Sequence, residues 1–253
     1  MNERVIGIIG AMHEEINSIL QLMADVKESS YGRRTYYSGT INGLKTILVF
    51  SRWGKVAAGT TVTSLILKFN ITDLIFIGVA GAIGHQLRIG DIVIAERLVQ
   101  HDMDARPLMD RYEIPLLGIT YFEPDSNLVA LAEKAIHTTL DNQNQAFIDQ
   151  DKKEEFLLTS PKVYKGTIAS GDQFFARQAD KDTLLSNLPD TLCVEMEGAS
   201  VAQVCYEYEV PFVVIRIISD EANENSAINF VDFIVYVSSK YSHEIIKNIF
   251  SLL

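Results

Sequence analysis

The sequence predicts one α/β domain over residues 1–253, a three-layer α/β/α arrangement in which helices cover both faces of a central mixed, twisted sheet. Two observations support this prediction. Short apolar runs with strand character alternate along the chain with segments of helical spacing. No linker rich in Pro, Gly or Ser divides the chain, and 253 residues of which 47% are hydrophobic can build one large core.

The first part of the chain supplies a strand, a helix and a hairpin. Val5–Gly10 is a continuous apolar run, which is typical of a strand covered on both faces. Apolar residues recur at helical spacing over Met12–Leu22. The strong turn signal Asn42-Gly43 separates Arg34–Ile41 from Thr46–Phe50, so these two runs are predicted to pair as a hairpin.

The same criteria predict the remaining elements. In chain order these are a helix over Val56–Phe69, strands over Leu74–Val79 and Asp91–Ala95, a helix over Leu128–Leu140, strands over Val163–Ala169 and Leu192–Glu195, a helix over Ala199–Tyr208, a strand over Phe212–Ile218 and a helix over Phe230–Leu252. The start of the last helix is ambiguous, because Ile234–Val237 also has strand character. Strands separated by helices in this way indicate a mixed sheet with a helical layer on each face.

The segment His101–Pro124 has three prolines and little periodicity, and we predict a long loop there. Long loops in compact domains are often functional or interfacial. Near its start the loop has His101, Asp102 and Asp104, whose side chains are of types that can coordinate a metal ion. One histidine and two carboxylates this close in sequence rarely complete a metal shell, so we predict no metal site.

Charge and cysteine content restrict the possible partners. The formal net charge is −11 and the sequence pI is about 4.9. Nucleic acids and anionic membranes require a basic surface, so neither is the expected main partner. Cys193 and Cys205 stand in apolar surroundings and are interpreted as buried thiols of a reducing compartment. The first apolar run is short and ends in a turn, so no signal peptide or spanning helix is expected, and we predict a cytoplasmic location.

Polar and aromatic residues follow five of the predicted strands. In open α/β sheets, ligands bind beyond the carboxyl ends of strands, so these residues are expected to surround a common site. The segments are Gly10-Ala11-Met12-His13-Glu14-Glu15, Gly78-Val79-Ala80-Gly81-Ala82-Ile83-Gly84, Ser170-Gly171-Asp172-Gln173-Phe174-Phe175, Glu195-Met196-Glu197 and Ser219-Asp220.

Glu195 and Glu197 are candidate functional residues, because they follow an apolar strand and precede an Ala-rich helix start. Two residues apart on an extended chain, they would point the same way and could grip adjacent sugar hydroxyls. Equally, they could neutralise an arginine or charge the first turn of a helix.

The glycines match no nucleotide-binding fingerprint. Gly7 and Gly10 do not form a dinucleotide motif, and the chain has no Walker-type phosphate loop. Gly78, Gly81 and Gly84 fit either a close approach of the backbone to a ligand or a plain tight turn.

Six short motifs together establish a family resemblance. They are Gly10-Ala11-Met12-His13-Glu14-Glu15, Gly54-Lys55-Val56-Ala57-Ala58, Gly90-Asp91-Ile92-Val93, Ala169-Ser170-Gly171-Asp172, Val194-Glu195-Met196-Glu197 and Ile218-Ser219-Asp220. In this order they closely resemble the 5′-methylthioadenosine/S-adenosylhomocysteine nucleosidase family of the purine nucleoside phosphorylase-like superfamily. The match covers nearly the whole chain, from about Val5 to Phe233.

The resemblance implies hydrolysis of the bond between adenine N9 and ribose C1′. Adenine is a poor leaving group as an anion, so a general acid must protonate N7, and Asp220 matches the family residue with that role. Its carboxyl would have to carry a proton near neutral pH. Glu15 matches the base that deprotonates water. Glu197 matches the carboxylate that binds the ribose hydroxyls, where it can also stabilise positive charge on the sugar.

The resemblance also implies the substrate contacts. The matching residues are Met12, Trp53, Val79, Gly81, Phe174, Phe175, Met196, Arg216, Ser219 and Phe230. Adenine would lie against Phe174 and the backbone near Phe175. Taken singly, the phenylalanines are more often core residues, Asp220 fits a helix cap, and Glu15 fits a solvated helix face. No cofactor is implied. The expected partners are a nucleoside, water and a second copy of the chain in a homodimer.

Trp53 and Val79 depart from the family pattern. The family usually has a small or aliphatic residue where this chain has Trp53, and many members have a serine where it has Val79. Trp53 could narrow the pocket around the 5′ substituent, change its preference or turn away. The family is typically dimeric, and in its dimers a partner loop closes the same end of the pocket. Tyr112, Ile114, Pro115 and Leu116 of this chain stand in the corresponding region, which matches the family poorly.

Three alternatives remain open from the sequence. An aminodeoxyfutalosine nucleosidase would act on the same adenine-ribose end of a different substrate. A phosphorylase would need cationic groups around a phosphate, whereas Glu14 and Glu15 would repel one. A binding protein on the same fold would have lost catalysis, against which the presence of Glu15, Glu197 and Asp220 argues.

Overall fold

The computed structural model describes residues 3–141, 146–223 and 230–253. Its strands are β1 (Val5–Gly10), β2 (Ala24–Tyr31), β3 (Arg34–Ile41), β4 (Leu44–Phe50), β5 (Asp73–Ala82), β6 (Ile92–Gln100), β7 (Val163–Ser170), β8 (Thr191–Glu195) and β9 (Phe212–Asp220). Its helices are α1 (His13–Leu20), α2 (Lys55–Phe69), α3 (Ser126–Asp141), α4 (Gln150–Glu155), α5 (Gln178–Asn187), α6 (Gly198–Glu207), α7 (Phe230–Phe233), a π-helix over Ile234–Ser238 and α8 (Ser239–Leu252).

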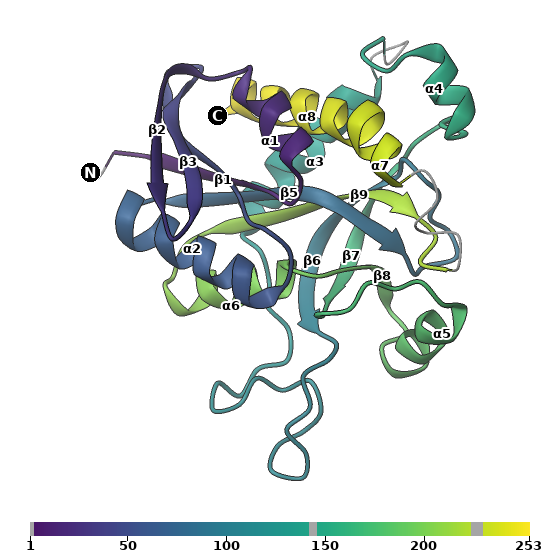
Figure 1. Cartoon of the computed structure of the whole chain (residues 1–253). Helices are drawn as coiled ribbons and strands as arrows, with labels where there is room; N and C mark the ends of the chain where they lie inside the picture. The colour runs from purple at the N-terminus through teal and green to yellow at the C-terminus, as the bar shows by residue number, and fades with distance from the viewer. Residues whose placement is uncertain (1–2, 142–145, 224–229) are drawn as a thin grey trace.

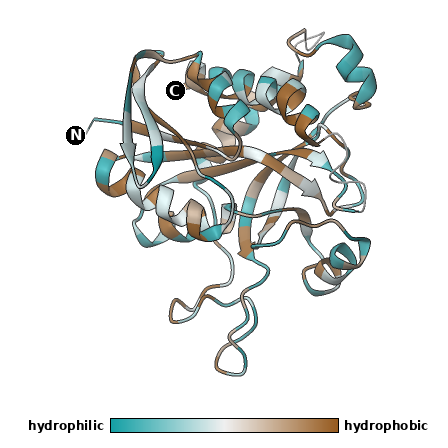
Figure 2. Ribbon diagram, in the orientation of Figure 1, coloured by the Kyte–Doolittle hydropathy of each residue, from teal (hydrophilic) through white to brown (hydrophobic). Residues whose placement is uncertain are grey.

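The three-layer prediction is confirmed. Helices α1, α3 and α8 pack together on one face of the sheet, and α2 and α6 pack together on the other (Figure 1). The strands between these layers are largely hydrophobic, while the outlying helix α4 is mostly hydrophilic (Figure 2). Burial of apolar surface on both faces of the sheet is therefore the main stabilising term.

The sheet is mixed, and part of it closes on itself. Within the described residues, its order is β2-β3-β4-β1-β5-β8-β7-β6-β9, with a further pairing between β5 and β9. Strand β5 pairs in parallel with β1 along one edge. At the end of β5, Gly81 and Ala82 pair antiparallel with β8. The strands β5, β9, β6, β7 and β8 thus form a closed ring, which the sequence did not predict.

Some elements were also missed or predicted too short. All residues of β2 are exposed and its sequence is mostly polar, so it lacks the apolar pattern that identifies a strand. It lies at the edge of the sheet, where β3 is its only partner strand among the residues described. Helices α4 and α5 were missed for the same reason, since α4 buries no residue and α5 has almost no apolar stripe. Strands β5 and β6 extend beyond the predicted ends.

The loop predicted over His101–Pro124 is confirmed, and it projects away from the sheet between β6 and α3 (Figure 1). Isolated bridges between Leu98 and Phe122 and between Ile114 and Ile119 are its only strand-like pairings among the described residues. Tyr112 and Ile114 are buried within the chain, whereas Leu116 is 93% exposed. None of the helices described is long and apolar enough to cross a membrane.

Candidate active site

A mostly apolar cavity of about 360 Å³ lies at the ends of β1, β5, β7, β8 and β9. This volume is within the range of small-molecule sites. Residues from all five predicted strand-end segments contribute to its wall, which confirms that these segments converge. The lining residues are Ala11, Met12, Trp53, Val79, Ala80, Gly81, Phe174, Val194, Glu195, Met196, Glu197, Ser219, Asp220 and Phe230.

Asp220 is the last residue of β9 and is held on both carboxylate oxygens. The Ser219 hydroxyl donates to Oδ2 at 2.8 Å, and the backbone N–H of Ala222 donates to Oδ1 at 2.9 Å. The side chain is 7% exposed and faces the cavity. These contacts fix the carboxyl in one orientation, as required of a group that exchanges a proton with a bound ligand.

Gly81 pairs with Asp220 on one side and with Val194 on the other, at the junction of three strands. A Cβ atom at Gly81 would lie 3.0 Å from Asp220 Oδ1 and 3.0 Å from Ala222 Cβ. The glycine is therefore required by the close approach of β5 to the Asp220 carboxyl, rather than by a turn.

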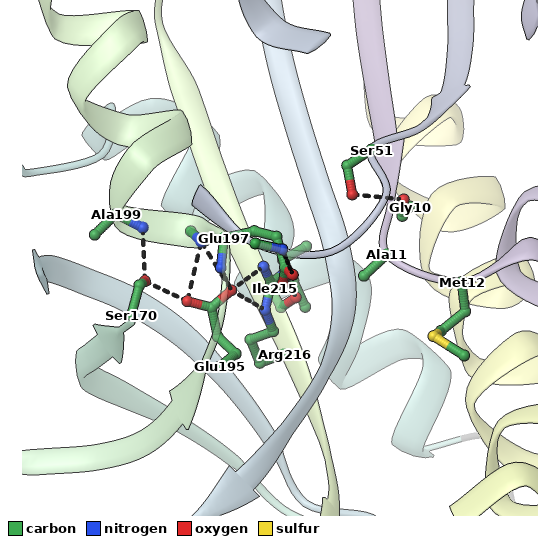
Figure 3. Close-up of polar contacts among 12 residues, drawn as sticks. Gly10, Ala11, Met12, Ser51, Ser170, Glu195, Glu197, Ala199, Ile215 and Arg216 are labelled. Carbon is green, nitrogen blue, oxygen red and sulfur yellow. Dashed lines mark hydrogen bonds and ion pairs between the residues drawn. The ribbon is translucent and has the colours of Figure 1, made fainter. Parts of the chain in front are cut away.

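Glu195 does not form a pair with Glu197, so the hypothesis that both carboxylates face one way is wrong. The Glu195 carboxylate accepts hydrogen bonds from Arg216 Nη2 at 2.6 Å and from the N–H of Gly198 at 2.8 Å, and it also contacts the Ser170 hydroxyl (Figure 3). Glu197 follows the end of the strand, where the backbone has turned to φ −136° and ψ −39°. The chain therefore leaves the extended conformation between the two residues.

Arg216 is fully buried beneath the cavity rather than part of its wall. Its guanidinium lies over the Phe76 ring, 3.9 Å from the centroid, and forms the ion pair with Glu195. We therefore revise its expected role from a substrate contact to the partner that neutralises Glu195. Glu195 therefore has the alternative role that the sequence allowed, since it neutralises an arginine. Its carboxylate also accepts the N–H of Gly198 and so holds the first turn of α6.

Glu197 is 5% exposed, and its carboxylate contributes to the cavity wall. The backbone N–H of Gly54 donates to Oε1 at 2.8 Å, which joins the start of α2 to the start of α6. Burial, together with the nearby Glu195 charge, raises the pKa of Glu197 to about 7.

Glu15 is fully buried directly behind Met12 and does not itself line the cavity. The N–H groups of Ala11 and Met12 donate to Oε2 at 3.1 and 3.0 Å, and the Ser238 hydroxyl donates to Oε1 at 2.8 Å. Burial raises the pKa of Glu15 to about 7 despite these donors. The alternative of a solvated helix face is therefore wrong.

Aromatic side chains cover the remaining wall. Phe174 and Phe230 meet edge to face with centroids 6.0 Å apart and both line the cavity. Phe175 is 7% exposed and lies behind Phe174, in a smaller depression that shares Gly81 and Asp220 with the main cavity. Trp53 is 62% exposed and its indole Nε1 donates to the Ala11 carbonyl at 3.1 Å, so it stands at the cavity wall and does not turn away.

Several supporting residues were missed by sequence reasoning. Ser238 lies in the π-helix, 223 positions from its partner Glu15, and no local pattern marks it. The sequence marks Ser170 only as a strand-end residue, although its hydroxyl also accepts the N–H of Ala199 at 2.7 Å. These partners are set by how distant segments pack, which local spacing does not reveal.

The described residues contain no group of three or more metal-ligand side chains. Asp102 instead pairs with Lys55 Nζ at 2.6 Å and accepts the N–H of Asp172 at 3.0 Å. These contacts tie the start of the long loop to α2 and to the segment that carries Phe174.

The fold and this site define a class of protein. The family model described as "Phosphorylase superfamily" matches residues 5–251, so the chain belongs to that superfamily. It is 34% identical to the 5′-methylthioadenosine/S-adenosylhomocysteine nucleosidase of Staphylococcus carnosus over 98% of this chain and 100% of the relative. Within the superfamily, the chain is a member of the methylthioadenosine/S-adenosylhomocysteine nucleosidase family.

Two further comparisons are informative. The aminodeoxyfutalosine nucleosidase of Helicobacter pylori is 36% identical over 93% of this chain and 95% of its own length. The crystal structure of the Neisseria meningitidis methylthioadenosine/S-adenosylhomocysteine nucleosidase with methylthio-immucillin-A superposes with a TM-score of 0.86, at 30% identity, over 99% of this chain and 100% of that chain. The two relatives are named for different nucleoside substrates.

Proposed function

We propose that the chain hydrolyses the N-glycosidic bond of 5′-substituted adenosines, with 5′-methylthioadenosine and S-adenosylhomocysteine as substrates and adenine as a product. The observation that carries the proposal is the convergence of Asp220, Glu197 and Glu15 around one cavity of nucleoside size. 5′-Deoxyadenosine and aminodeoxyfutalosine share the adenine-ribose end and are the candidate further substrates.

The roles follow from where the charges develop. Cleavage gives a cationic, oxocarbenium-like sugar and a leaving adenine that must gain a proton. Asp220, fixed at the end of β9, supplies the proton to N7. Glu197 accepts hydrogen bonds from the ribose hydroxyls and stabilises the positive charge of the sugar. Glu15, which accepts the Met12 N–H beside the cavity, takes the proton of the attacking water.

The decisive experiment is adenine release from a panel of 5′-substituted adenosines, with and without inorganic phosphate. We expect release in phosphate-free buffer at the same rate as with phosphate. Turnover that requires phosphate would identify a phosphorylase. No adenine from any member of the panel would identify a binding protein on this fold.

The pH dependence should follow both Glu15 and Glu197, because the pKa of each is raised to about 7. The value of kcat/KM should rise as pH rises through about 7, where Glu15 becomes available as a base and Glu197 gains its negative charge. Protonated Glu15 also stabilises the fold, since the folded state holds this proton more tightly than the unfolded chain. That contribution is complete below the unfolded value of 4.5 and is lost as pH rises through about 7.

Glu15→Gln tests both effects in one variant. It should lower kcat by about 10²–10⁴-fold and reduce the decline of unfolding free energy between pH 5 and 8, as followed by urea titration, leaving the part that Glu197 contributes. Glu14→Gln, which neutralises the neighbouring and less buried carboxylate, is the control. Normal turnover in the Glu15 variant would remove Glu15 from the mechanism.

Trp53 should restrict the 5′ substituent. Its indole lines the cavity and is anchored on the Ala11 carbonyl. Trp53→Ile removes that hydrogen bond and opens the wall, so the ratio of kcat/KM for a bulky to a small 5′-alkylthio group should rise about tenfold. An unchanged ratio would show that Trp53 does not contact the substituent.

We further propose that the protein is a cytoplasmic homodimer. In the family resemblance, a partner loop closes the 5′ end of the pocket, and the corresponding segment 101–124 projects from this chain. Of its four predicted contact residues, Leu116 is almost fully exposed, whereas Tyr112 and Ile114 are buried within their own chain. Leu116 and the adjacent Pro115 are therefore better placed than the other two to reach a partner.

A further inference from the structure

Ser238 is a fully buried polar residue to which the roles above assign no part in the reaction. It is the last residue of the π-helix Ile234–Ser238, and its hydroxyl donates to Glu15 Oε1 at 2.8 Å. A buried hydroxyl is costly unless it forms a hydrogen bond, and this one forms its bond with the carboxyl that the proposed function uses as the base. The contact therefore joins the C-terminal helical segment to the chemistry of the site.

The two carboxylate oxygens of Glu15 have different surroundings. Oε2 accepts the N–H groups of Ala11 and Met12, at 3.1 and 3.0 Å, so both of its acceptor positions are used. Oε1 has Ser238 as its only hydrogen-bond donor among the described residues. Because a carboxylate oxygen can accept two hydrogen bonds, Oε1 keeps one acceptor position. Oε1 is therefore the oxygen that can take a proton from water.

The backbone around Ser238 is unusual. In the π-helix the N–H of Ser239 donates to the carbonyl of Ile234, five residues earlier, instead of four as in an α-helix. Such turns are rare within α-helices and occur frequently at functional sites. The helical segment that contains this turn begins at Phe230, which lines the active-site cavity. One segment thus contributes Phe230 to the cavity wall and Ser238 to Glu15.

The packing of α8 against α1 does not depend on the Ser238 hydroxyl. The Ser18 hydroxyl donates to the carbonyl of Ser239 at 2.7 Å, and His243 Nδ1 lies 2.7 Å from the carbonyl of Ser18. These two contacts fix α8 on α1 one turn beyond Glu15. Ser238 is therefore held in place by its neighbours, and loss of its hydroxyl should leave the two helices together.

We propose that Ser238 is a positioning residue for Glu15, whose hydroxyl holds Oε1 with its remaining acceptor position directed at the attacking water. The inference rests on the proposed function, because it assumes that Glu15 is the base. The same hydrogen bond favours the ionised carboxylate. Burial raises the pKa of Glu15, and the Ser238 hydroxyl and the Arg216 cation oppose that rise. Ser238 thus orients the base and keeps more of it ionised near neutral pH.

Other ionisable groups lie on the elements packed around Glu15. They are His13 and Glu14 on α1, Lys45 on β4, Tyr236 in the π-helix, Lys240, Tyr241, His243, Glu244 and Lys247 on α8, Arg216 on β9, and Glu197 in the cavity wall. Glu197 titrates in the same range as Glu15. Within the residues described, the Ser238 hydroxyl bonds to Glu15 and to none of these groups, so a change at Ser238 acts on Glu15 directly.

The test measures kcat and KM for 5′-methylthioadenosine between pH 5 and 9 in Ser238→Ala. The rising limb of kcat/KM should move to higher pH by about one unit, because the ionised carboxylate loses a donor. On the alkaline plateau, where Glu15 is ionised in both proteins, kcat should still be about fivefold lower because the carboxylate is less well oriented. KM should change less than about twofold, since Ser238 does not line the cavity.

Ser239→Ala is the matched control. Its hydroxyl donates to the carbonyl of Val235 at 2.7 Å within the same helical segment, so the substitution removes the same group one residue further on. It should leave the limb and the plateau unchanged. Ser238→Cys fills the space with a weaker donor and should move the limb in the same direction as Ser238→Ala, by a smaller amount. Equal profiles for the wild type and Ser238→Ala, or equal shifts in Ser238→Ala and Ser239→Ala, would overturn the inference.

A double-mutant cycle tests whether Ser238 acts through Glu15. In the Glu15→Gln background, Ser238→Ala should lower the remaining kcat by less than about twofold, because the base is already lost. A further fivefold loss in that background would show that Ser238 acts elsewhere and would contradict the inference. If the wild type released no adenine from any 5′-substituted adenosine, the proposed function itself would fail, which the wild-type assay shows before any variant is measured.

Discussion

Asp220→Asn is expected to abolish most adenine release while the protein still binds nucleoside. The amide removes the exchangeable proton of the carboxyl, and loss of a general acid lowers kcat by about 10²–10⁴-fold. Asn is nearly isosteric with Asp and its Oδ1 can still accept the Ala222 N–H, which is 2.9 Å away in the wild type. The fold and the cavity should therefore persist.

Two measurements separate chemistry from binding in this variant. Single-turnover adenine release gives the chemical step, and calorimetric titration with 5′-methylthioadenosine gives Kd. We expect the first to fall by orders of magnitude and the second to change less than about fivefold. Ser219→Ala is the matched control, because it removes the donor to Oδ2 and a long contact with the Ala80 carbonyl but keeps the carboxyl, so it should reduce kcat far less. Turnover near that of the wild type in Asp220→Asn would assign the proton to another donor.

Arg216→Met is expected to have the largest effect on stability. The substitution leaves the Glu195 carboxylate buried without its cation, because the Glu195 side chain is only 3% exposed. Breaking a buried ion pair on one side costs about 3–5 kcal/mol, much of it from the charge left unpaired. The free energy of unfolding from urea titration should fall by this amount.

Arg4→Met is the control for this prediction, since Arg4 pairs with Asp73 at 2.8 Å but has a side chain that is 41% exposed. Its loss should cost less than about 1 kcal/mol. Restoring neutrality in Arg216→Met/Glu195→Gln should recover part of the stability lost in the single variant. A loss below 1 kcal/mol in Arg216→Met would show that the Glu195 charge is compensated by its other donors alone.

The sequence by itself determined the three-layer architecture and the residues around the site. Apolar strand runs such as Val5–Gly10 and helical spacing such as that of Val56–Phe69 are local patterns, and local patterns encode which face of an element is buried. The ordered motifs that end in Glu15, Glu197 and Asp220 indicated the family, and they stand at strand ends, where open α/β sheets bind their ligands.

Only the tertiary structure decided which groups meet. It closed five strands into a ring, placed Arg216 beneath Glu195 instead of against a substrate, and brought Ser238 to Glu15. These contacts join residues far apart in the chain, and their energies depend on burial and distance in three dimensions. Neither quantity can be read from spacing along a sequence.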